Sequence, residues 1–149
     1  MADVVSPEVR SRMMSGIRGK DTKPEVIVRR GLHALGFRYK LHDKALPGKP
    51  DLVFPKFKAV VFVHGCFWHK HDCKYFKWPQ TRREFWRSKI EGNVSRDKVS
   101  VEALKQIGWR VAIVWECSFR DGKDASEQIQ KLSEWIHSGS QELEIRGGS

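Results

Sequence analysis

The chain has 149 residues, enough for one domain with a buried core. Its 28 Lys and Arg against 18 Asp and Glu leave a formal net charge of +10, which favours a polyanionic partner such as nucleic acid, although such charge can also lie on a face that is only solvated. The apolar runs at 59–63 and 111–115 are too short to cross a bilayer, and the N-terminus lacks a signal-peptide core. We therefore expect a cytoplasmic protein without membrane contact.

Two helices are predicted near the N-terminus. Residues 6–17 place apolar side chains along one side of a short polar helix. A second helix is predicted over 22–35, because Thr22 and Glu25 have the spacing of a capping box and Gly36 can end the helix.

Four segments have the composition of β-strands. They are residues 37–41, 51–54, 58–63 and 109–115. The last two are apolar enough to be buried on both faces, which is typical of central strands.

Three further helices are predicted in the second half of the chain. They cover residues 81–91, 95–107 and 125–137. The first begins at another capping box, Thr81 to Glu84, and the Ser- and Gly-rich residues 138–149 are predicted to form a flexible tail. This order predicts a single α/β domain over 1–137, with a mixed central sheet flanked by helices.

Residues 64–73 hold three histidines, two cysteines and two large aromatic residues in ten positions. Imidazole and thiolate are the preferred zinc ligands, and imidazole is the commonest general base. A closed, structural zinc site could be formed by Cys66, His71, Cys73 and Cys117. An odd number of cysteines in a reducing compartment favours ligation over disulfide bonding, although Cys117 could also be an ordinary buried thiol and His71 a surface residue.

Asp51 is the first candidate for a catalytic carboxylate. It follows the loop Pro47-Gly-Lys-Pro and begins the predicted strand 51–54. In a hairpin with 58–63, its carboxylate would come near the end of the second strand, a position suited to an oxygen-rich Mg²⁺ site. Asp51 could instead be a turn residue in a loop rich in Gly and Pro.

Several motifs, taken in order, resemble those of the very short patch repair endonucleases. They run from the N-terminal helix to about Trp135 and include Asp21-Thr-Lys-Pro-Glu25, Leu46-Pro-Gly-Lys-Pro-Asp51, His64-Gly-Cys-Phe-Trp-His69, Thr81-Arg-Arg-Glu-Phe-Trp86, Asn93-Val-Ser-Arg-Asp97, and Gly108-Trp-Arg-Val through Val114-Trp-Glu-Cys117. The resemblance implies a restriction-endonuclease-like fold. It also implies a Mg²⁺-dependent nick in duplex DNA, 5′ of the thymine in a T·G mismatch left by deamination of 5-methylcytosine.

The resemblance implies a metal-binding role for three residues. Asp51 would bridge two Mg²⁺ ions at the scissile phosphate, and the carbonyl of Val63, where the family often has Thr, would be a further ligand. Glu25 would hold metal-bound waters, although its position is also that of the capping-box glutamate. In such a two-metal hydrolysis, one ion activates the attacking water and the other stabilises the departing oxygen.

The resemblance assigns proton transfer to the histidines. His69 would be the general base that deprotonates the attacking water, with Asp97 orienting its ring. His64 would contact a phosphate or a metal-bound water. Loop polarity or additional zinc ligation is the alternative for both histidines.

Aromatic side chains would find the mismatch. Phe67 and Trp68 lie between the proposed zinc ligands and would enter the base step as a wedge, to which the family resemblance adds Trp86. Unstacking requires less free energy where pairing is already disturbed, so a mismatch favours entry. Ordinary core packing is the alternative for these rings.

Other DNA contacts are implied by the same resemblance. Met14, in a DNA-contacting N-terminal helix within residues 1–20, would enter the opposite groove, with core packing as its alternative. Lys89 and Asn93 would face the duplex. We expect a nucleoid-associated monomer acting on duplex DNA with a T·G mismatch, and other mismatch-repair proteins and a repair polymerase are candidate partners.

Two other functions stay open at this point. One is a different Mg²⁺-dependent restriction-type nuclease on the same fold. The other is a non-enzymatic, zinc-stabilised module that binds mismatched DNA. The second would explain the charge, the cysteines and the aromatics, but it leaves Asp51 and His69 without a role.

Overall fold

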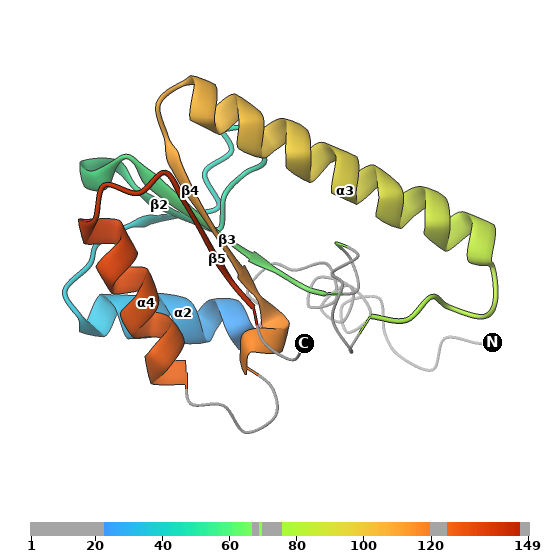
Figure 1. Cartoon of the computed structure of the whole chain (residues 1–149), viewed down its shortest axis with the longest axis horizontal. Coiled ribbons are helices and arrows are strands. Elements are labelled where there is room, and N and C mark those ends of the chain that lie inside the picture. Colours follow the sequence, from blue (N-terminus) through green and yellow to red (C-terminus); the bar gives the residue numbers. More distant parts are fainter. Residues whose placement is uncertain (1–22, 67–68, 70–75, 120–124, 147–149) are drawn as a thin grey trace, which may run out of the picture.

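The computed structural model describes residues 23–66, 69, 76–119 and 125–146. Within these residues, one mixed sheet has the strand order β1-β2-β3-β4-β5 (Figure 1). The strands are β1 (Lys40–Leu41), β2 (Leu52–Phe54), β3 (Ala59–His64), β4 (Arg110–Trp115) and β5 (Glu142–Ile145). β1 and β3 run antiparallel to β2, whereas β3, β4 and β5 run parallel to one another. The predicted mixed sheet is confirmed.

Helices cover both faces of this sheet. The described residues form α2 (Lys23–Ala34), α3 (Arg83–Gln106) and α4 (Ala125–His137). α2 and α4 pack on one face and α3 on the other (Figure 1), and α3 and α4 are the crossovers that the parallel strands require. α2 and α4 approach closely, since a Cβ added to Gly31 would lie 2.7 Å from the Ile129 side chain. No helix in the described part of the chain has the length and apolar character needed to traverse a bilayer.

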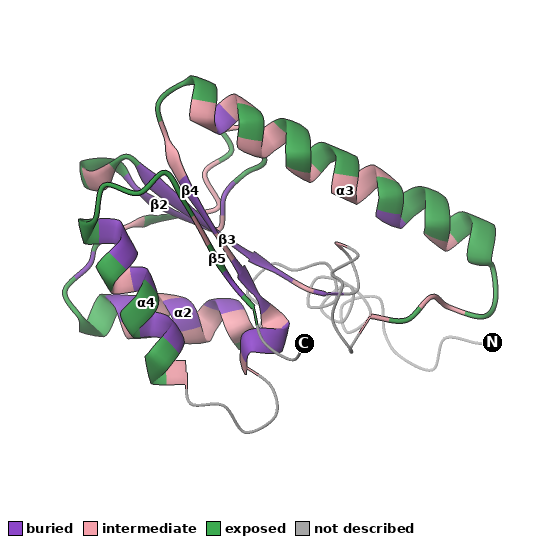
Figure 2. Cartoon of the chain, viewed as in Figure 1, coloured by how far each residue is buried: buried purple, intermediate pink, exposed green. Residues whose placement is uncertain are grey.

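Strand β3 lies at the centre of the sheet, and all its residues are buried (Figure 2). Successive side chains of a strand point to opposite faces. Val61 and Val63 pack in the core beside α2 and α4, whereas Val60 and Phe62 pack in the core beside α3. With helices on both faces, the strand has no solvent side, and the prediction of a central strand here is confirmed.

Gly36 ends α2 as predicted. Its φ is 97°, and the amides of Gly36 and Phe37 donate back to carbonyls of the last helical turn at 3.0 and 3.1 Å, which is a Schellman motif. The motif directs Phe37 into the core. Only Lys40–Leu41 of the strand predicted over 37–41 therefore pairs, as β1.

The two helices predicted over 81–91 and 95–107 are one continuous helix, α3. The sequence favours a break near Gly92 because glycine has a low helix propensity. However, Ile90 and Leu104 are buried on either side of that point, and their tertiary packing outweighs a local preference of about 1 kcal/mol.

The predicted helix starts have different outcomes. The capping box at Thr81 is wrong, because α3 begins at Arg83, and the preceding Arg82 has a φ of 52° and makes no side-chain cap hydrogen bond. Thr22, from the other capping box, lies outside the described residues, as does the helix predicted over 6–17.

The C-terminal segment also differs from its prediction. Within the expected flexible tail, 138–149, residues Glu142–Ile145 form β5 and pair with β4. An edge strand is held largely by its backbone ladder, and Ile145 is the single buried residue of β5, so the apolar pattern is too short to reveal it. The Arg110 guanidinium supports the connection, donating to carbonyls at the end of α4 and in the following loop at 2.8 and 3.3 Å.

Candidate catalytic site at the end of strand β3

Two clusters of polar side chains meet the carboxyl end of β3. Among the described residues, the carboxylate cluster consists of Glu25, His42 and Asp51, and the imidazole cluster consists of His64, His69 and Asp97. In each cluster the possible ligand atoms lie within 4.8 Å of one another. The clusters attach to consecutive residues of the strand, because the Val63 amide donates to Asp51 Oδ2 at 2.7 Å and His64 follows Val63. All the residues predicted to be catalytic lie in these two clusters.

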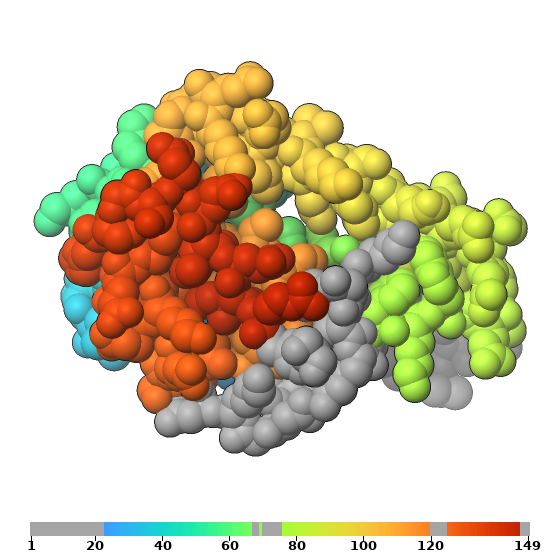
Figure 3. All heavy atoms as spheres, viewed as in Figure 1, coloured from blue at the N-terminus to red at the C-terminus, as the bar shows by residue number. Residues whose placement is uncertain are grey.

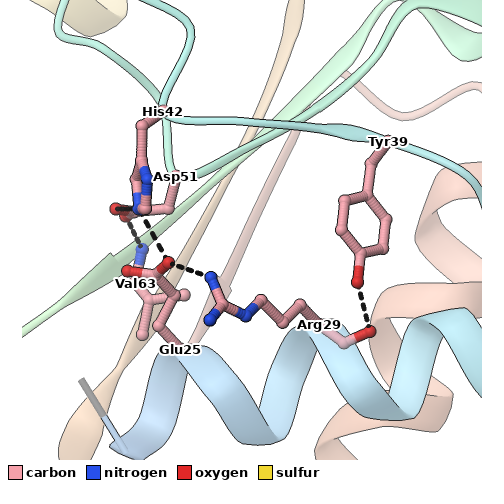
Figure 4. Close-up of polar contacts among 6 residues, drawn as sticks. All are labelled: Glu25, Arg29, Tyr39, His42, Asp51 and Val63. Carbon is pink, nitrogen blue, oxygen red and sulfur yellow. Dashed lines mark hydrogen bonds and ion pairs between the residues drawn. The ribbon is translucent and has the colours of Figure 1, made fainter. Parts of the chain in front are cut away.

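The carboxylate cluster is centred on a histidine (Figure 4). His42 Nε2 lies 2.7 Å from Glu25 Oε2 and 3.9 Å from Asp51 Oδ1. Arg29 Nη1 donates to the same Glu25 oxygen at 3.2 Å. The Glu25 side chain is fully buried, so its charge is compensated by these neighbours rather than by bulk water.

Strand register places His42 beside Asp51. Leu41 pairs with Leu52 in the antiparallel β1–β2 ladder, and at the next step the His42 amide donates to the Asp51 carbonyl at 3.1 Å. The φ of His42 is 49°, a left-handed conformation that ends the strand at this point. The His42 side chain, at the end of β1, is thereby held next to the Asp51 carboxylate, at the start of β2.

Helix α2 supplies Glu25 from its first turn. Glu25 and Arg29 are four residues apart and form an ion pair along the helix. The hydroxyl of Tyr39 donates to the Arg29 carbonyl at 2.7 Å (Figure 4). This contact ties the helix to the segment that leads into β1, and so to His42.

Burial raises the pKa of Asp51 to about 8, against the lowering effect of the Val63 amide hydrogen bond, and the adjacent Glu25 carboxylate raises it further. A proton or a cation near Asp51 relieves this unfavourable charge. The donor set of two carboxylates and one imidazole fits a divalent cation, and carboxylate oxygen is the protein ligand type that Mg²⁺ prefers.

The imidazole cluster is a stack of two rings held by one carboxylate. The centroids of His64 and His69 are 3.8 Å apart and their planes differ by 5°. Asp97, on α3, is hydrogen-bonded to Nδ1 of His69. This contact is the one that the orienting role predicted for Asp97 requires, because a carboxylate on Nδ1 fixes the ring and turns Nε2 to the other side. The catalytic roles themselves stay predictions.

Half of the predicted zinc ligands fall within the described residues. Cys66 and Cys117 are both buried and pack in one cluster with Trp115, although they are distant in the sequence. The Cys66 amide donates to Glu116 Oε1 at 3.1 Å, which ties the segment after β3 to the end of β4. The other two predicted ligands, His71 and Cys73, lie outside the described residues.

Helix α3 carries the predicted DNA-contacting residues that the structure describes. Trp86, Lys89 and Asn93 follow one another at spacings of three and four residues, and Asp97 comes four residues later, so they follow one side of the helix. Lys89 is exposed, and Trp86 and Asn93 are partly exposed. Met14, Phe67 and Trp68 lie outside the described residues.

Sequence reasoning missed His42. It is one residue beyond the strand predicted over 37–41, and a strand pairing with the start of 51–54 would have been needed to place it beside Asp51. Arg29 was missed for a simpler reason, since its spacing from Glu25 is visible in the sequence but describes an ordinary surface ion pair equally well.

Comparisons with known proteins identify the family of this chain. The family model described as "DNA mismatch endonuclease Vsr" matches residues 2–75. The "Type II nicking enzyme V.XorIIP" of Xanthomonas oryzae pv. oryzae is 50% identical over 121 residues, 81% of this chain and 89% of the relative. The "DNA mismatch endonuclease Vsr" of Escherichia coli is 43% identical over 138 residues, 91% of this chain and 88% of the relative. The chain therefore belongs to the Vsr family of DNA mismatch endonucleases.

Proposed function

We propose that the protein acts in very short patch repair by nicking one strand of duplex DNA, 5′ of the thymine in a T·G mismatch. The observation that carries the proposal is the meeting of two clusters at the end of β3. One has the donors for a divalent cation, and the other joins a histidine to an orienting carboxylate. Family membership supports the same activity, because one relative is named a DNA mismatch endonuclease and others are named nicking enzymes.

The carboxylate cluster would bind the catalytic metal, with Asp51 and the carbonyl of Val63 as ligands and Glu25 holding metal-bound waters. The raised pKa of Asp51 supports this assignment, because its carboxylate lies beside that of Glu25 and a bound cation would stabilise its ionised form. When bound, Mg²⁺ would supply activation of the attacking water and stabilisation of the departing oxygen. Asp51 must lose its proton to take part.

The imidazole cluster would handle the proton of the water nucleophile. His69 would accept that proton on Nε2, and the Asp97 carboxylate on Nδ1 would stabilise the resulting imidazolium. The water oxygen would then attack the phosphorus, and the bond from phosphorus to the departing oxygen would break. His64, stacked on His69, would contact the phosphate.

The DNA would lie along α3. In the space-filling view the N-terminal half of this helix extends away from the body formed by α4 and β5 (Figure 3), and its residues are largely exposed (Figure 2). Lys89 and Asn93 would contact the duplex, and Trp86 would join Phe67 and Trp68 in the wedge. The net charge of +10 favours association with the phosphate backbone.

Two further assignments, of the fold and of a structural metal, complete the proposal. The mixed sheet with Asp51 beside the end of β3 supports a restriction-endonuclease-like fold. The shared burial of Cys66 and Cys117 supports a structural zinc site with His71 and Cys73 as the remaining ligands. One copy is enough for a single-strand nick, so we expect a monomer.

The test uses two labelled duplexes that are identical except for one T·G pair replaced by C·G, each with Mg²⁺ and with EDTA. We expect a Mg²⁺-dependent nick only beside the mismatched thymine. Asp51→Asn should abolish nicking and preserve binding, whereas the control Asp43→Asn, in the same loop, should leave both nicking and binding unchanged. Equal cutting of both duplexes would indicate a different nuclease, and binding without cutting would indicate a non-enzymatic module.

A further inference from the structure

Trp115, at the end of β4, contacts both rings of the imidazole cluster. Its ring centroid lies 5.2 Å from that of His64 and 6.2 Å from that of His69, and the interplanar angles are 71° and 72°. Both are edge-to-face contacts at favourable separations. The β3–β4 register explains the arrangement, because His64 and Trp115 are directly paired in the parallel ladder and therefore point to the same face.

The indole of Trp115 is itself held by a hydrogen bond to strand β5. Its Nε1–H donates to Glu144 Oε2 on β5 at 2.8 Å. Glu144 pairs with Ile113 of β4, so it lies on the same face as Trp115, two residues back along the ladder. A line of contacts thus runs from the edge strand β5 to Trp115 and from Trp115 to His64 and His69.

This arrangement limits the orientation of the indole. A buried tryptophan without a fixed Nε1–H can change its χ2 torsion, which is broad for an aromatic ring. The hydrogen bond to Glu144 selects one orientation, and in that orientation the ring closes one side of the stacked imidazoles. A general base acts efficiently only when its nitrogen stays within hydrogen-bonding reach of the proton that it removes.

We propose that Glu144 is a positioning residue for the nicking reaction, which fixes Trp115 and through it the orientation of His64 and His69. This rests on the proposed function, in which His69 is the general base. Glu144 itself touches neither the metal-binding carboxylates nor the histidines in the contacts described above, so it acts through the indole.

β5 offers a matched control. Glu142 lies two residues before Glu144, on the same strand and the same face, and its carboxylate is bonded to Lys105 of α3. Both side chains are exposed acids with one cross-element partner each among the contacts above. Replacing Glu142 therefore tests what loss of an acid on β5 does to the fold, without releasing Trp115.

The experiment measures kcat and KM for the T·G duplex in Glu144→Ala, Glu144→Gln and Glu142→Ala, together with the indole Nε1–H NMR signals of the same proteins without added Mg²⁺. Trp115→Phe assigns the signal of Trp115. We expect Glu144→Ala to shift that signal and to lower kcat about tenfold with KM unchanged, since small misplacement of a reacting group costs up to about a hundredfold. Glu144→Gln keeps an acceptor oxygen and should stay close to the wild type, as should Glu142→Ala.

Glu144→Ala in a Trp115→Phe background completes a double-mutant cycle. Adding Glu144→Ala there should change kcat by less than about twofold, because residues that act through one contact are not additive. The proposal is overturned if kcat is unchanged while the Trp115 signal moves, if Glu142→Ala has the same effect, or if the loss persists in the Trp115→Phe background. A wild type that does not nick the T·G duplex would overturn the proposed function and this proposal together, whereas normal nicking by Glu144→Ala overturns this proposal alone.

Discussion

His42 faces the carboxylate of Asp51 across the β1–β2 ladder, with Nε2 3.9 Å from Oδ1, and the same nitrogen lies 2.7 Å from Glu25. One imidazole therefore lies between the two acids that would bind the metal. Groups that orient metal ligands typically contribute tenfold or more to metal affinity or activity. His42 is the residue that connects the chemistry of Glu25 to that of Asp51.

Replacing His42 by Ala should raise the Mg²⁺ concentration required for half-maximal nicking, by about tenfold. The reason is that Glu25 loses a contact that holds its carboxylate toward Asp51. DNA affinity in EDTA should not change. His33→Ala is the control, because His33 is an exposed histidine on α2, the helix that carries Glu25. An unaltered Mg²⁺ dependence in His42→Ala would mean that the ring does not position the acid.

The raised pKa of Asp51 predicts how metal-free stability depends on pH. The folded state keeps the Asp51 proton up to about pH 8, whereas the unfolded chain releases it near pH 4. Between these values the folded state binds more protons, so the free energy of unfolding falls as pH rises. Asp51→Asn cannot titrate and should show a flatter profile.

Denaturant unfolding in EDTA from about pH 4 to about pH 9 measures this difference. The wild type should lose stability relative to Asp51→Asn as the pH rises from about 4 to about 8, and the difference should level off above about pH 8. Because Mg²⁺ displaces the same proton, its affinity for the wild type should rise with pH. Parallel profiles for the two proteins would contradict the raised pKa.

Much of this site could be predicted from the sequence. Asp51 could be found because its loop stands before an apolar strand, and His64 and His69 because they follow the central strand. His42 and Trp115 could not, since their roles come from strand register, a property of pairs of segments rather than of either one. The continuity of α3 between the helices predicted over 81–91 and 95–107 could not be predicted, because it depends on the tertiary packing of Ile90 and Leu104. β5 was missed because an edge strand with one buried side chain leaves almost no pattern.

Gly48, three residues before Asp51, approaches α3 closely. An added Cβ would lie 2.7 Å from the Ser100 Cβ, and Gly48 has a φ of 76°. Gly48→Ala should therefore lower the free energy of unfolding by about 3 kcal/mol through overpacking and backbone strain. Because the clash pushes the loop away from α3, nicking should also fall through displacement of Asp51.

Gly36→Ala separates the two causes. Gly36 has a φ of 97° but nothing within 4 Å of an added Cβ, so it should lose only about 1 kcal/mol, from the left-handed backbone. Thermal unfolding and nicking rates of both variants provide the comparison. Equal losses would show that the contact with Ser100 is unimportant, and normal nicking by Gly48→Ala would show that the loop does not set the position of Asp51.

Replacing Cys117 tests whether this residue is a zinc ligand or an ordinary buried thiol. Its side chain is fully buried beside Cys66 and Trp115, a setting that fits either role. If Cys117 is a zinc ligand, Cys117→Ala should lower zinc content and thermal stability together, because the binding free energy of a structural zinc is part of the folding free energy. If Cys117 is an ordinary buried thiol, the same substitution would remove one sulfur atom from the core and leave the zinc in place.

Metal analysis of purified protein, together with melting curves with and without added Zn²⁺, decides between these outcomes. Added zinc should raise the melting temperature of the wild type and have little effect on Cys117→Ala. Loss of stability with full zinc content would contradict ligation by Cys117. Trp115 belongs to one buried cluster with both cysteines and also contacts the stacked histidines. Loss of zinc should therefore also lower kcat, because the indole that holds the general base would lose part of its support.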